Sequence, residues 1–152
     1  MKISLVIIIY RCNSPIAEES SIFCKNVLNS KNIKAFRIAS NFNEQSLSSY
    51  IKENSLLPEI VIVLGGDGTV LKSANELIEY DIPLLSFNIG GNLGFLTQDK
   101  NFLFDKSFID ILEKDEFIIE NRTRLKCNTY RNQKDKSREK IASYEALNDF
   151  YF

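Results

Sequence analysis

The sequence predicts an α/β fold built on a parallel sheet. Ile3–Ile9 is an apolar run broken only by Ser4, which is typical of a parallel strand covered on both faces. The β-branched run Ile60–Leu64 ends in a glycine turn that leads directly into a helical pattern. Leu84–Phe87 predicts a further strand, and strand, helix and strand at this length form a right-handed βαβ unit. We therefore expect a Rossmann-like parallel sheet with flanking helices, followed by the start of a second, β-rich domain.

Local signals predict the other elements of the first part. The Ser-Pro pair at 14–15 is typical of an N-cap and a first helical position, and predicts a helix to about Leu28. Lys34–Ala39 reads as a second strand. The polar stretch Asn41–Asn54 is ambiguous, and we expect a short helix from Ser46 onward.

The helix after the glycine turn has the clearest pattern in the chain. We expect Thr69 to cap its N-terminus. Asp81 and Pro83 are expected to end it. Apolar side chains recur on one face at helical spacing, and these are Val70, Leu71, Ala74, Leu77 and Ile78.

The pattern changes after Thr97. Asp105–Glu113 predicts a helix, and the mixed charges of Arg131–Lys140 predict a solvated hairpin loop. We therefore expect two domains, an α/β domain at 1–100 and, at 101–152, a connecting helix with the first strands of an incomplete β-rich domain. The expected antiparallel strands are Phe117–Glu120, Arg124–Tyr130 and Ile141–Phe152.

Composition excludes several classes of site. The 152 residues include 44% hydrophobic and 26% charged residues, and the formal net charge of −1 does not favour nucleic acid or anionic membranes as partners. The chain has no His, so Ser-His or Cys-His catalysis and His-ligated metals are excluded. Cys12, Cys24 and Cys127 are odd in number and widely spaced, as in reduced cytosolic proteins. The apolar N-terminus lacks a cleavage pattern, so we expect a buried strand there.

The glycine turn Gly65–Thr69 contains one carboxylate, Asp67. Strand, glycine turn and helix start together are typical of a phosphate site. A carboxylate about 4 Å from a phosphate charge costs roughly 4 kcal/mol at an effective dielectric near 20. We therefore expect Asp67 to take a proton, bind a metal or accept a hydrogen bond from a substrate hydroxyl. The alternative is that Asp-Gly serves only as a favourable turn pair.

A second glycine segment, Asn88–Thr97, also follows a strand. Because ligands of parallel sheets lie beyond the carboxyl ends of the strands, both glycine segments are expected at one site. The sequence contains neither a Walker-type P-loop nor a Gly-x-Gly-x-x-Gly fingerprint. Alone, the second segment is weak evidence, because such a loop can simply turn the chain.

Taken together, these segments resemble the NAD kinase family. The resemblance rests on Gly-Gly-Asp-Gly-Thr at 65–69 and on Asn-x-Gly-x-x-Leu-Gly-Phe-Leu-Thr at 88–97. It extends to Ile-Glu-Asn-Arg at 119–122, with Leu125, and to Ala-Leu-Asn-Asp at 146–149. The first motif is shared with diacylglycerol and sphingosine kinases, whereas the second is more specific to NAD kinases.

The resemblance implies transfer of the ATP γ-phosphoryl group to the 2′-hydroxyl of the adenosine ribose of NAD, with a divalent metal ion, Mg²⁺. Asp67 would be the catalytic carboxylate, with Gly68 against the dinucleotide and the rest of the turn facing the ATP phosphates. Lys72 would contact the nucleotide, with a solvated helix residue as the alternative. The other implied binding residues are Gly65, Gly66, Thr69, Asn88, Asn148 and Asp149.

Two departures from the family pattern affect these expectations. Asp149 stands where the family more often has Glu, and the family continues beyond the position at which this chain ends. We therefore expect the N-terminal portion of an NAD kinase, with little activity alone. The alternatives are a lipid kinase and a non-catalytic nucleotide-binding remnant. The resemblance further implies nucleotides as partners rather than nucleic acid or membranes, a cytoplasmic location, and a homodimer or homotetramer at full length.

Overall fold

The computed structural model describes residues 2–41, 46–132 and 138–147. Two compact units divide the chain, residues 1–119 and 120–152. The first contains a four-stranded, all-parallel sheet in the order β2-β1-β3-β4. Its strands are β1 (Leu5–Tyr10), β2 (Lys34–Ala39), β3 (Ile60–Leu64) and β4 (Leu84–Phe87). The predicted parallel sheet is confirmed, with β1 starting two residues later than expected.

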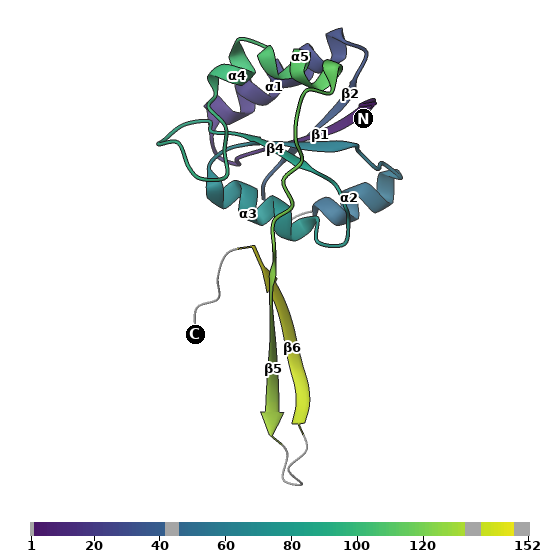
Figure 1. Ribbon diagram of the computed structural model, residues 1–152, viewed down its shortest axis with the longest axis vertical. Coiled ribbons are helices and arrows are strands. Elements are labelled where there is room, and N and C mark those ends of the chain that lie inside the picture. Colours follow the sequence, from purple (N-terminus) through teal and green to yellow (C-terminus); the bar gives the residue numbers. More distant parts are fainter. Residues whose placement is uncertain (1, 42–45, 133–137, 148–152) are drawn as a thin grey trace. The chain divides into compact units, whose positions relative to one another are not determined.

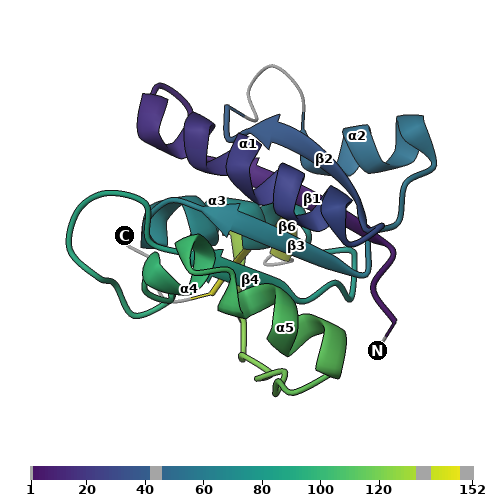
Figure 2. The ribbon, with the colours of Figure 1, turned by 90° about the horizontal axis from the view of Figure 1, so that it is seen from above.

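Five helices accompany this sheet within the described residues, and they cover both of its faces (Figure 1). Helices α1, α4 and α5 lie on one face, and α2 and α3 lie on the other (Figures 1 and 2). Their bounds are α1 (Pro15–Ser30), α2 (Leu47–Asn54), α3 (Asp67–Glu76), α4 (Asn101–Phe104) and α5 (Ser107–Lys114).

The apolar runs of β1 and β3 follow from this double covering. Alternate residues of β1 point to opposite faces, so Val6 and Ile8 pack toward α1 while Ile7 and Ile9 pack toward α2 and α3. All four side chains are fully buried. A strand with one wet face would instead alternate apolar and polar residues.

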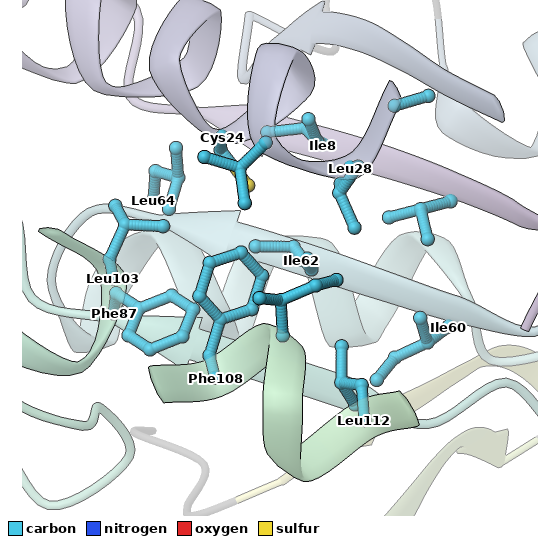
Figure 3. Packing of buried hydrophobic residues seen from close by; sticks show 14 of the residues in the cluster. Ile8, Cys24, Leu28, Ile60, Ile62, Leu64, Phe87, Leu103, Phe108 and Leu112 are labelled. Carbon is cyan, nitrogen blue, oxygen red and sulfur yellow. The ribbon is translucent and has the colours of Figure 1, made fainter. Parts of the chain in front are cut away.

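The layer of α1 and α5 forms the larger core cluster (Figure 3). Phe108 of α5 packs edge-on against Phe87 of β4, with ring centroids 5.6 Å apart. Cys24 and Leu28 of α1 reach the same cluster. Burial raises the pKa of the Cys24 thiol to about 12, so this thiol acts as a core side chain. Cys12 and Cys127 are also free thiols.

Several local expectations need correction. The predicted helix Asp105–Glu113 is formed as α5, but it begins only at Ser107, because Lys106 adopts a left-handed backbone (φ 65°) between α4 and α5. The predicted strand Phe117–Glu120 is not formed. Phe117 is half-buried against the first core cluster, but Ile118 and Ile119 are 95% and 51% exposed, and the run pairs with no strand among the described residues. Ile78 lies beyond the end of α3 and is exposed.

The second unit is an antiparallel hairpin of β5 (Leu125–Asn132) and β6 (Arg138–Ala146). Two of the expected antiparallel strands are therefore confirmed. Both extend into Arg131–Lys140, the segment whose mixed charges predicted a loop. The end of the predicted strand, 148–152, lies outside the described residues. The helices α4 and α5 belong to the first compact unit and bury Leu103, Phe108 and Leu112 in its core, while the expected domain boundary at residue 100 stays a prediction.

Glu59 joins the starts of β3 and β1. Its carboxylate accepts hydrogen bonds from the N–H of Leu5 (2.7 Å), and from the N–H (3.1 Å) and the hydroxyl (2.9 Å) of Ser4. Desolvation raises the pKa of Glu59, but these hydrogen bonds outweigh it, and the net pKa is lowered. The charged carboxylate therefore stabilises the folded state above the ordinary carboxyl pKa of about 4.3, and this contribution is lost as the pH falls through the lower folded pKa.

We expect Glu59→Gln to lower the free energy of unfolding by about 1–2 kcal/mol near neutral pH, because the charged acceptor is lost at a half-buried site. The difference from the unsubstituted chain should shrink as the pH falls below about 4. Urea unfolding across this pH range measures both effects. Glu19→Gln, at an exposed position of α1, is the matched control. An equal loss for the two variants would contradict the role of Glu59.

Candidate active site

The candidate site lies at the carboxyl edge of the parallel sheet. The strand order places β1 and β3 side by side, while β2 and β4 lie on opposite sides of this pair. Such a point is where parallel α/β sheets usually bind ligands, because the loops that leave the two central strands diverge. Both α1 and α3 begin at this edge, directly after the loops that follow β1 and β3.

The glycine turn packs tightly against the first turn of α3. Gly65 donates its N–H to the carbonyl of Phe87 (3.0 Å), which ties the turn to β4. A Cβ atom on Gly65 would lie 2.6 Å from Oγ1 and 2.9 Å from Cβ of Thr69, so a side chain is excluded. Gly66 is the N-cap, and the predicted capping role of Thr69 is wrong. Thr69 is the third residue of α3, is buried, and donates its N–H to the carbonyl of Gly66 (2.9 Å).

Asp67 is the first residue of α3, and its carboxylate turns toward the second glycine segment. Its Oδ2 accepts the N–H of Phe95 (3.0 Å), and its Oδ1 accepts the N–H of Leu96 (3.1 Å). The backbone of Gly94 lies against the same carboxylate. Asp67 and Gly94 are 27 residues apart in sequence, and the fold brings their two segments into contact at the Asp67 side chain.

Residues 88–98 form a loop that is closed at its base. Asn88 donates its N–H to the carbonyl of Gln98 (2.9 Å), and Gln98 donates its N–H to the carbonyl of Ser86 (2.8 Å). The hydroxyl of Ser86 donates to the carbonyl of Leu96. Gly90 and Gly91 have φ values of 86° and 87°, a backbone conformation that favours glycine.

Asn88 is buried and also supports the loop. Its Nδ2 donates to the carbonyl of Asn92. Its Oδ1 is buried and has no hydrogen-bond partner among the described residues. A buried acceptor without a partner costs about 1–3 kcal/mol, so this atom is suited to a donor group of a ligand.

The expected roles of three residues, Lys72, Asn148 and Asp149, stay predictions. Lys72 is exposed on α3, and five residues along a helix place it roughly 140° around the axis from Asp67. Asn148 and Asp149 lie outside the described residues. The sequence prediction missed the N–H groups of Phe95 and Leu96, because backbone donors have no residue signature. In the sequence, Gly94 was the one residue that could have indicated a close approach of this backbone to Asp67.

The described residues contain no cluster of three metal-ligating side chains. In the same part of the chain, no helix has the length and apolar character needed to cross a membrane. From a half-buried position at this edge of the sheet, the carboxylate of Asp67 can accept a hydrogen bond from a ligand or bind an ion.

Comparison with known proteins places the chain in a family. Residues 6–117 match the ATP-NAD kinase N-terminal domain family. The chain is 62% identical over 147 residues to NAD kinase 1 of Prochlorococcus marinus subsp. pastoris, which covers 97% of the chain and 49% of that protein. It is 40% identical to NAD kinase 1 of another Prochlorococcus marinus strain, over 100% of the chain and 50% of that protein.

A solved structure supports the fold. The crystal structure of yeast NADH kinase complexed with NADH superposes with a TM-score of 0.69 at 18% identity, over 97% of this chain and 48% of the yeast chain. The chain thus spans about half the length of the curated relatives it matches. Because the family match covers residues 6–117, the chain belongs to the NAD kinase family, of which it contains the ATP-NAD kinase N-terminal domain.

Proposed function

We propose that this chain supplies the first half of an enzyme that transfers the γ-phosphoryl group of ATP to the 2′-hydroxyl of the adenosine ribose of NAD. The observation that carries the proposal is the oriented carboxylate of Asp67 at the N-terminus of α3, between two glycine segments. Family membership supports the same reaction. A sugar hydroxyl is a poor nucleophile, and a positioned base contributes typically 10²–10⁴-fold to such a step.

In this proposal Asp67 accepts the proton of the 2′-hydroxyl while that oxygen attacks the γ-phosphorus and ADP departs. The glycine turn and the first N–H groups of α3 face the phosphates, because the start of a helix has donors without intrahelical partners. Gly68 lies against the dinucleotide, and Asn88 offers its free Oδ1 to a ligand donor. Lys72, Asn148 and Asp149 remain assigned to nucleotide binding by resemblance.

A divalent ion fits these residues only if it binds together with ATP, whose phosphates would supply most of its ligands. Mg²⁺ is usually held by substrate phosphates with one or two carboxylates, and Asp67 is the carboxylate available at this edge. When bound, the ion would neutralise charge on the phosphates. We infer a cytoplasmic protein that assembles as a homodimer or homotetramer at full length, with nucleotides as its partners.

Activity should require the second half that the relatives possess. We define the joined chain as residues 1–147 continued by the second half of the 62% identical Prochlorococcus marinus relative. We expect the joined chain to form NADP from NAD and ATP, and the 152-residue chain to form little or none, in a coupled assay that detects NADP. Steady NADP formation by the 152-residue chain would contradict the need for a second half.

The same assay separates the alternatives. Phosphorylation of extracted lipid by the joined chain, without NADP formation, would indicate a lipid kinase. Binding of NAD and ATP without any turnover, in both the joined chain and the 152-residue chain, would indicate a non-catalytic nucleotide-binding protein.

A further inference from the structure

The carboxylate of Asp67 is held by main-chain donors at both oxygens. One N–H from each of two consecutive residues, Phe95 and Leu96, reaches one oxygen each, at 3.0 and 3.1 Å. This arrangement fixes the plane of the carboxylate as well as its position. Because a carboxylate oxygen accepts in two directions, each oxygen keeps one direction free for another donor.

Gly94 makes this arrangement possible by the absence of a side chain. A Cβ atom on Gly94 would lie 2.5 Å from Cγ and 2.6 Å from Oδ2 of Asp67, well inside van der Waals contact. Gly94 does not need the left-handed conformation, because only Gly90 and Gly91 among the described glycines have positive φ. The requirement at position 94 is therefore one of space for the carboxylate.

The loop that carries these donors is held independently of Asp67. Its base is closed by the hydrogen bonds between Asn88, Gln98 and Ser86, and the hydroxyl of Ser86 fixes the carbonyl of Leu96. Thr97 adds a bond from the N–H of Gly94 to its Oγ1 (3.4 Å). These bonds within the loop do not involve Asp67, whose carboxylate is placed by its two side-chain torsions.

We propose that Gly94 and the N–H groups of Phe95 and Leu96 form a positioning frame for the carboxylate of Asp67. This inference rests on the proposed function, in which Asp67 takes a proton from a ribose hydroxyl. The frame turns the free acceptor directions of the carboxylate toward the incoming hydroxyl before the substrate binds. A misplacement of about 1 Å in such a group can cost 10²-fold in rate, so the frame contributes to kcat and little to nucleotide binding.

The first test is Gly94→Ala in the joined chain. The added methyl group must push the carboxylate out of the frame, so we expect kcat to fall about 100-fold while KM for NAD and ATP changes less than about threefold. The control is Gln98→Ala in the same loop, where the exposed side chain is removed and the backbone bonds are kept. Equal kcat for Gly94→Ala and the unsubstituted joined chain would overturn the proposal.

A double-mutant cycle separates positioning from a general effect on the loop. In the background of Asp67→Asn, Gly94→Ala should lower kcat less than about threefold further, because its effect acts through the carboxylate. A full 100-fold loss in that background would overturn the proposal and indicate a structural role. If Asp67→Asn itself leaves kcat unchanged, the proposed function fails instead, and the two failures are therefore distinguishable.

A spectroscopic test in the 152-residue chain covers the case in which Gly94→Ala does not fold. Asp67→Glu moves the carboxylate by one methylene at a half-buried position, which the fold should tolerate. The amide proton resonances of Phe95 and Leu96 should move upfield in Asp67→Glu, because their hydrogen bonds to the carboxylate are lost. Unchanged resonances at both amides would show that the frame does not exist in solution.

Discussion

Asp67→Asn should lower kcat of the joined chain by about 10²–10⁴-fold, because it removes the carboxylate that we propose as the proton acceptor. Asn keeps the size and shape of Asp, so binding of ATP and NAD should stay within about threefold of the unsubstituted value. Steady-state kinetics of NADP formation give kcat, and calorimetric titration of each nucleotide gives the dissociation constants. A loss in kcat without a loss in binding identifies a group that acts in the transition state.

The control for Asp67→Asn is Asp81→Asn. Asp81 is an exposed carboxylate that follows α3 and lies outside the glycine segments, so this variant removes the same charge without touching the site. We expect its kcat to match that of the unsubstituted chain. If both variants reduce kcat equally, the effect is one of net charge. If Asp67→Asn keeps full kcat, Asp67 is not the base.

The two central strands of the parallel sheet, β1 and β3, were predictable because they are buried on both faces and therefore read as unbroken apolar runs. The same reasoning failed at Phe117–Glu120, where Ile118 and Ile119 form an apolar pair without a neighbouring strand. A strand requires hydrogen-bonding partners that can lie anywhere in the chain, and local composition does not report them. The break at Lys106 was missed for a similar reason, because a left-handed lysine has no composition signal.

The part of the candidate site that could be predicted from sequence is Asp67, because a carboxylate is an unexpected residue type in a turn that resembles a phosphate site. A carboxylate among glycines at a strand end is costly near phosphate, and this cost pointed to Asp67. The helix start was misplaced at Thr69 because sequence favours a hydroxyl cap, whereas Gly66 occupies that position without a side-chain hydrogen bond. The donors that hold Asp67 belong to the main chain, and only the fold shows which N–H groups face it.

The second variant with a large expected effect is Phe108→Ala, which should lower the free energy of unfolding. This variant also tests where the first unit ends. Phe108 is 3% exposed and packs against Phe87 in the core cluster that α5 shares with α1 and the sheet (Figure 3). Removing a buried phenyl ring costs about 3–5 kcal/mol, which is a large part of the 5–15 kcal/mol that typically stabilises a domain. We therefore expect urea unfolding of the 152-residue chain at a much lower midpoint, with part of the protein unfolded in water.

Phe102→Ala is the matched control for Phe108→Ala. Phe102 lies on α4 and is 46% exposed, so the same chemical change should cost less than about 1 kcal/mol there. The comparison tests whether residues beyond 100 belong to the first core. If Phe108→Ala costs no more than Phe102→Ala, α5 contributes little to this core, and the boundary at residue 100 would describe the folding unit better than one after Ile119. A difference of several kcal/mol would instead show that the sheet depends on α5 to cover Phe87, and that a shorter fragment ending near residue 100 would expose this ring to water.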